Sequence, residues 1–118
     1  MGPPGAARLV KVAAYVPDLM DRSKLSAAAP GTTFVPNPRL LVEVEADVVV
    51  LDLSRPGVLA ALPELSHVRT IGFGSHVDVE NLQAARDAGC DVVLARSAFF
   101  GGLPRVLDEG TSAKMADS

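Results

Sequence analysis

Tryptophan is absent from this sequence, and tyrosine and cysteine occur once each among its 118 residues. The single cysteine, Cys90, excludes an intramolecular disulfide and a metal site made of cysteines alone. No apolar run exceeds five residues, which is far too short to cross a bilayer, and the first residues lack the charged and apolar regions of a secretory signal. Aromatic residues make up only 4% of the chain, which argues against flavin binding and base stacking.

Positive charge is also scarce. Lys and Arg number 11 against 14 Asp and Glu, the net charge is -3, and basic residues never run together. No strong positive field exists to gather nucleic acid or anionic lipid. We therefore expect a cytoplasmic protein that binds neither nucleic acid nor a membrane, and nothing in the pattern calls for a metal or a cofactor.

The length suits one domain with its own core. Proline and glycine crowd residues 1–7 (MGPPGAA), and residues 110–118 (GTSAKMADS) show no apolar periodicity. Both ends are expected to be disordered tails. The folded domain is expected to cover residues 8–109.

Short apolar runs alternate with helix-like segments inside that domain. Asp47–Asp52 is the clearest strand, because four successive apolar residues indicate burial on both faces, as in a parallel sheet. The predicted strands are Leu9–Tyr15, Thr32–Val35, Asp47–Asp52, Val68–Phe73 and Asp91–Ala95. The predicted helices are Asp18–Ala29, Asn37–Glu45, Val58–Leu65, Asp78–Ala88 and Phe99–Asp108, the third broken at Pro63.

Five such units predict an α/β fold of the flavodoxin-like (βα)5 kind, a three-layer sandwich around a parallel sheet. Parallel strands need right-handed crossovers, and 2-1-3-4-5 is the common order for five strands. Functional residues in these sheets lie at the carboxyl ends of the strands. The segments to inspect are Tyr15–Asp18, Asp52–Gly57, Gly74–His76 and Arg96–Ser97.

Two segments give the chain a resemblance to the receiver domain of response regulators (CheY-like). Ala46–Gly57 (ADVVVLDLSRPG) resembles the third strand and the loop after it, with Asp52 at the phosphoacceptor position. Val68–Ala98 resembles the stretch from the fourth to the fifth strand, including its Ala-Gly-x-Asp turn. The layout from Leu9 to Leu107 is similar to the whole receiver domain, with a short middle.

The other positions that carry a receiver's chemistry depart from its pattern. A receiver has acidic residues that hold Mg²⁺ at the end of its first strand, where this chain has Tyr15-Val16-Pro17. Gly74, followed by Ser75, stands in place of the Thr or Ser after the fourth strand, and Arg96 in place of the Lys after the fifth. Mg²⁺ prefers carboxylate and phosphate oxygens, and Asp52 alone is a poor ligand set.

The resemblance and its departures together predict a pseudo-receiver, a non-enzymatic regulatory module that acts without phosphorylation. An Asp52–Arg96 ion pair is expected to fill its pocket. Since receivers commonly dimerise through the fourth helix, fifth strand and fifth helix, the same face is a candidate homodimer or protein interface here. Its candidate residues are Val92, Phe99 and Phe100; one of the two rings is expected in the core, and packing of both there is an open alternative.

Two alternatives stay open. One alternative is an atypical receiver that is phosphorylated on Asp52. The other is an antagonist of anti-sigma factors of the STAS type: Val48–Gly57 also resembles the strand and loop of that family, although the Asp-Ser-Ser-Gly motif is missing.

Ser75 and His76 suggest nucleophilic catalysis, but adjacent side chains point apart. His67 is expected in an exposed loop and Cys90 in a structural, buried position.

Overall fold

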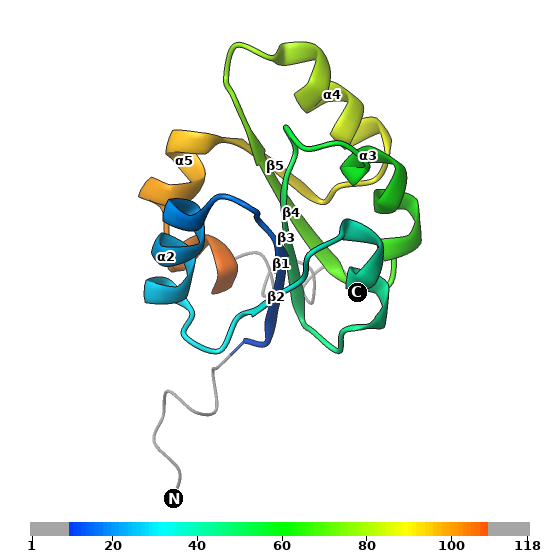
Figure 1. The fold of residues 1–118 in the computed structure, drawn as a ribbon. Coiled ribbons are helices and arrows are strands. Elements are labelled where there is room, and N and C mark those ends of the chain that lie inside the picture. Colours follow the sequence, from blue (N-terminus) through cyan, green and yellow to red (C-terminus); the bar gives the residue numbers. More distant parts are fainter. Residues whose placement is uncertain (1–9, 109–118) are drawn as a thin grey trace, which may run out of the picture.

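The computed structural model describes residues 10–108, and the expectations for 1–7 and 110–118 lie outside that range. Five parallel strands form one sheet in the order β2-β1-β3-β4-β5. This confirms the predicted flavodoxin-like (βα)5 arrangement (Figure 1). The strands are β1 (Val12–Tyr15), β2 (Thr33–Phe34), β3 (Val48–Asp52), β4 (Arg69–Gly74) and β5 (Val92–Ala95).

Helical segments cover both faces of the sheet. The helix α2 (Leu19–Ala28) and the helix α5 (Arg96–Gly101) lie on one side, together with the short helical segment that follows α5, and four other helical segments lie on the other side (Figure 1). The second group comprises η1 (Pro38–Glu43) and η2 (Leu62–Leu65), which are 3₁₀ helices, and the α-helices α3 (Val58–Ala61) and α4 (Val79–Asp87).

The helix starts follow local capping chemistry. The Asp18 side chain accepts hydrogen bonds from the amides of Met20 and Asp21, Asn37 caps η1, and Asp78 caps α4. These side chains satisfy amides that have no partner inside the helix. Each cap is the residue that the sequence indicated.

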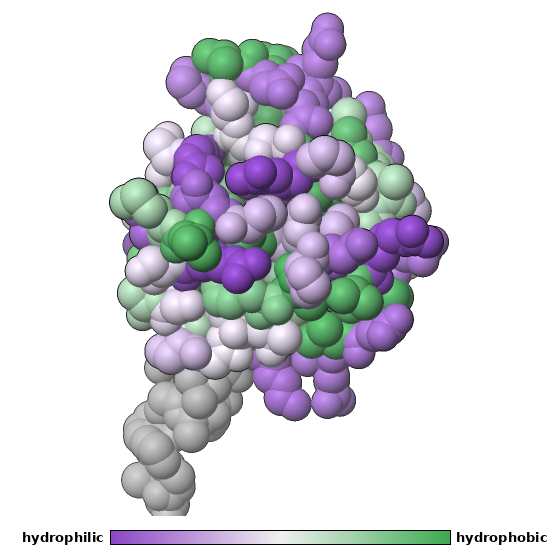
Figure 2. Space-filling model, viewed as in Figure 1, coloured by the Kyte–Doolittle hydropathy of each residue, from purple (hydrophilic) through white to green (hydrophobic). Residues whose placement is uncertain are grey.

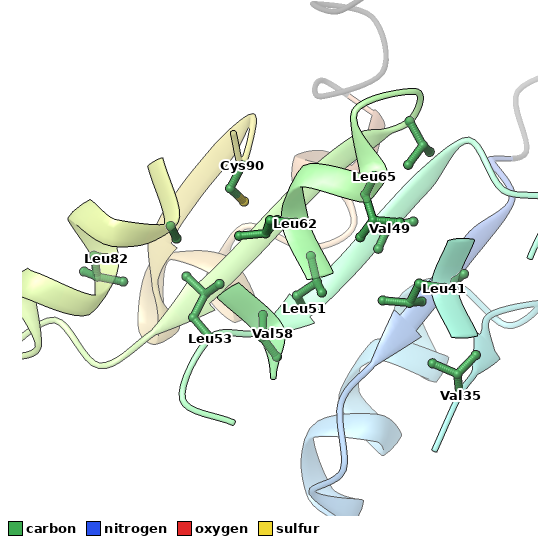
Figure 3. Close-up of a cluster of buried hydrophobic side chains, with 13 residues drawn as sticks. Val35, Leu41, Val49, Leu51, Leu53, Val58, Leu62, Leu65, Leu82 and Cys90 are labelled. Carbon is green, nitrogen blue, oxygen red and sulfur yellow. The ribbon is translucent and has the colours of Figure 1, made fainter. Parts of the chain in front are cut away.

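Two apolar clusters, one on each face of the sheet, make up the core. All five residues of β3 are buried, and they alternate between the clusters, with Val48 and Val50 on the α2 and α5 side. Val49 and Leu51 face the α3 and α4 side, where Figure 3 shows them beside side chains of η1, α3 and α4. Burial of both faces is what the unbroken apolar run predicted.

Two helical segments differ from the sequence prediction. Asn37–Glu45 was expected to form a helix, and the structure has a six-residue 3₁₀ helix there. The last helix was predicted to start at Phe99, but α5 begins at Arg96, directly after β5. Gly101 is the last residue of α5 and Gly102 its C-cap, and neither they nor Pro104 delay the start of the helix. The chain turns at 102–104 before a short helical segment at 105–108.

Residues 10–108 contain no helix that is both long and apolar enough to span a membrane.

Candidate functional site

The strand register brings the predicted site residues to one edge of the sheet. Tyr15 pairs with Leu51, Asp52 with Phe73, and Gly74 with Ala95. Because the strands are parallel, all four carboxyl ends meet at this edge. Asp52, Gly74, Ser75 and Arg96 therefore gather there, as the sequence predicted.

The Asp52 carboxylate is bound by its own loop. Asp52 is only 3% exposed. Its Oδ1 accepts hydrogen bonds from the Ser54 amide at 3.0 Å and from the Ser54 hydroxyl at 2.6 Å. Its Oδ2 lies 3.3 Å from Nε of Arg55. Both oxygens of this buried carboxylate thus have a donor within three residues, which compensates the cost of removing its charge from water.

The expected Asp52–Arg96 ion pair is wrong, because Arg96 binds a different carboxylate. Its Nη2 donates to Oδ1 of Asp21, a residue of α2. Asp21 is 1% exposed, and its other oxygen, Oδ2, is buried without a hydrogen-bond partner among the described residues. The guanidinium of Arg96 therefore ties α2 to the start of α5.

Arg96 also lies against two aromatic rings. Its guanidinium carbon is 5.6 Å from the ring centre of Phe73 and 5.3 Å from that of Phe100. Cation–π attraction favours this position. The bond to Asp21, more than any other contact, raises the pKa of Arg96, so this cation stays charged at every relevant pH.

Asp18 is the acidic residue that comes nearest in sequence to the end of β1. It lies three positions beyond Tyr15 and caps α2 with its Oδ1. The hydrogen bond from the Asp21 amide is the main reason that the pKa of Asp18 is lowered. The carboxylate therefore serves the helix start, as the sequence suggested.

A glycine at position 74 suits the packing around it. A Cβ atom there would lie 3.2 Å from a methyl group of Leu82 and 3.6 Å from Cβ of Leu53. Leu82 therefore crowds any side chain at position 74. The neighbouring Ser75 is exposed, and its hydroxyl accepts a hydrogen bond from the Val77 amide at 3.3 Å.

The other singled-out polar residues contribute little to this edge. His67 and His76 are exposed. Cys90 is 7% exposed, and burial raises the pKa of its thiol, so its side chain behaves as a small apolar group. Within residues 10–108, no three His, Cys, Asp or Glu side chains gather in a way that could hold a metal ion.

Phe99 lies in the core and is wrong as an interface residue. It is fully buried and stacks on Phe73, with ring centres 4.9 Å apart. Phe100 and Val92 are half-buried and pack at the edge of the same cluster. Those two residues stay predictions for an interface.

Asp21 is the residue at this edge that sequence reasoning missed. It precedes Leu25 by four positions, and both are buried on one face of α2. An aspartate on the apolar face of a helix that follows the first strand was the available signal, since buried carboxylates need a partner.

No protein-family model and no curated protein sequence matches the chain, but solved structures do. NtrX from Brucella abortus, solved in complex with ADP, is similar with a TM-score of 0.77 and 13% identity. That match covers 92% of this chain but only 28% of the NtrX chain, so this chain spans a minor part of that protein.

The second similar structure is the BeF3-activated receiver domain of nitrogen regulatory protein C (NtrC). Its TM-score is 0.70 and its identity 21%, and the match covers 91% of this chain and 98% of that domain. The strand order, the helices on both faces and this end-to-end match agree. The chain has the flavodoxin-like α/β fold of response-regulator receiver domains.

Proposed function

We propose that this chain is a pseudo-receiver: a non-enzymatic regulatory module of the cytoplasm that binds other proteins without being phosphorylated. The observation that carries the proposal is the state of Asp52. Ser54 and Arg55 already bind both of its oxygens, while Arg96 is held by Asp21. A phosphoryl group on either oxygen of Asp52 would displace the donor that now binds that oxygen.

The rest of the edge supports the same proposal. Phosphoryl transfer depends on positive charge, usually Mg²⁺, placed to stabilise the transferred group. Mg²⁺ is generally held by one or two carboxylates beside phosphate oxygens. Here Tyr15-Val16-Pro17 supplies no carboxylate, Asp18 caps a helix, and Leu82 crowds the side-chain space at Gly74.

The test is phosphorylation of the purified chain by acetyl phosphate with Mg²⁺, followed by intact mass measurement. We expect no phosphoryl adduct on the wild-type chain, and the Asp52→Asn variant serves as the baseline. The NtrC receiver, which was solved in its BeF3-activated form, is the positive control. A stoichiometric adduct that disappears in Asp52→Asn would overturn the proposal and establish the atypical phosphorylated receiver instead.

The position of Asp52 favours that second candidate. It ends β3 at the carboxyl edge of the sheet, where an acceptor must lie. The STAS-type alternative gains no comparable support, because neither similar structure is of that type.

Self-association through α4, β5 and α5 is the mode of action that the resemblance suggests. β5 is an edge strand whose four residues are all half-buried. Val92 belongs to this strand, and Phe100 lies on the adjoining helix α5. We expect a dimer by sedimentation velocity that Val92→Glu converts to a monomer. A wild-type chain that is monomeric at high concentration would exclude self-association. It would leave the proposal that the chain is not phosphorylated unaffected.

A further inference from the structure

A groove lies between η1 and the α3–η2 segment, away from the Arg96–Asp21 pair. Its volume is about 850 Å³, within the range of pockets that bind ligands. Gly57, Ala60 and Ala61 line it, and these small side chains leave the space unfilled. The hollow exists because η1 is only a short 3₁₀ helix and α3 has only four residues.

Two apolar side chains of η1 are accessible in the groove. Leu40 is 38% exposed and Val42 is 42% exposed, and both line the groove. Figure 2 shows hydrophobic side chains at the lower right, over the position of η1 in Figure 1, with hydrophilic ones around them. An apolar patch with a polar rim is typical of a protein interaction site.

Three charged residues line the same groove. Arg39, Glu43 and Glu64 are all exposed, and none of them has an ion pair with another described residue. Two carboxylates against one guanidinium leave this groove with an excess of negative charge. Charge complementarity therefore favours a basic occupant over an acidic one.

A second hollow of about 490 Å³ lies on the side of α3 that faces the Asp52 loop, where Arg55 and Asp78 line it. It has Gly57 and Ala60 in common with the groove. An occupant that reached both hollows would cross these two small residues, and an extended peptide segment suits that path better than a compact molecule.

We propose that the groove between η1 and α3–η2 binds a protein segment that carries apolar side chains flanked by lysine or arginine. The apolar side chains lie against Leu40 and Val42, and the basic groups pair with Glu43 and Glu64. The inference rests on the proposed function to the extent that an interaction module needs a docking surface. It places that surface on η1 and α3 in addition to the α4–β5–α5 face.

The experiment is an NMR titration of the full chain with a synthetic peptide of about 15 residues made of leucine, alanine and lysine. We expect saturable shifts in the amide signals of residues 37–43 and 57–65. The same peptide with glutamate in place of lysine should bind at least about tenfold more weakly, because exposed charge pairs contribute modestly but add up.

Variants on the exposed surface separate the groove from other sites. Glu43→Lys with Glu64→Lys should weaken binding of the lysine peptide about tenfold, and Ala60→Trp should block it by filling the groove. Glu80→Lys with Asp87→Lys, which reverses two exposed carboxylates on α4, is the matched control and should leave binding unaltered. If Ala60→Trp unfolds the chain, the charge reversals on the exposed rim still decide the outcome.

Shifts confined to other segments, equal binding of the two peptides, or no saturable binding at about 1 mM peptide would overturn the inference. So would a concentration-dependent dimer in which a second copy of the chain occupies the groove. Phosphorylation of Asp52 is measured separately by mass. Failure of the groove and failure of the pseudo-receiver proposal are therefore distinguishable.

Discussion

Replacing Arg96 by methionine tests the ion pair that joins α2 to the start of α5. Methionine keeps an apolar contact with the rings of Phe73 and Phe100 but removes the donor to Asp21. The Asp21 carboxylate, 1% exposed, would then be buried without a charge partner. We expect the Arg96→Met variant to be substantially less stable than the wild-type chain.

The magnitude follows from burial. Removing one partner of a fully buried pair costs about 3–5 kcal/mol. The Arg96 side chain is 46% exposed, so solvent already screens part of this interaction, and we expect a loss of about 2 kcal/mol at pH 7. In a domain of this size that corresponds to a decrease in Tm of about 10 °C.

Urea unfolding followed by circular dichroism measures the effect. Lys11→Met is the control, because its pair with Glu45 is exposed on both sides and should contribute less than about 0.5 kcal/mol. The double variant Asp21→Leu with Arg96→Met should recover most of the loss, since it leaves no buried charge. A loss for Arg96→Met no larger than that of Lys11→Met, or no recovery in the double variant, would refute the reasoning.

Three further predictions concern other parts of the domain. Gly72→Ala should cost about 1–3 kcal/mol in urea unfolding, because a Cβ there would lie 2.7–2.9 Å from Leu53 side-chain carbons; a neutral effect would contradict the packing. Cys90 should resist iodoacetamide at neutral pH, since burial raises the pKa of its thiol, and rapid labelling of the native chain would argue against burial. The free energy of unfolding should fall as the pH rises above about 9 toward that raised pKa, and the Cys90→Ala variant should not show this fall. Asp18→Ala should lower the Tm by removing a helix cap. Because the pKa of Asp18 is lowered, the difference in Tm between wild type and variant should persist above about pH 4 and vanish as the pH falls through that lowered pKa. A difference in Tm that is unchanged at pH 2 would exclude this role.

The two proposals rest on different parts of the structure. The pseudo-receiver proposal rests on Arg96, which is held by Asp21, and on Asp52, which is held by its own loop. The groove proposal rests on the space beside the short η1 and α3 segments.

Much of the fold followed from short-range patterns. The apolar run of β3 predicted a central buried strand, and Asp18, Asn37 and Asp78 marked helix starts, because capping depends on residues two or three positions apart. The start of α5 was misjudged, because glycines and a proline near its end were taken to delay a helix that the strand before it positions directly.

Local patterns in this sequence predicted the parallel strands, and the common order for five such strands predicted the sheet and the gathering of Asp52, Gly74 and Arg96 at one edge. Only the tertiary structure decided which carboxylate Arg96 binds. Asp21 and Arg96 are 75 positions apart, and a long side chain at the edge reaches more than one acid. The choice depends on packing of α2 against the Phe73 and Phe100 rings, a three-dimensional arrangement that no local pattern encodes.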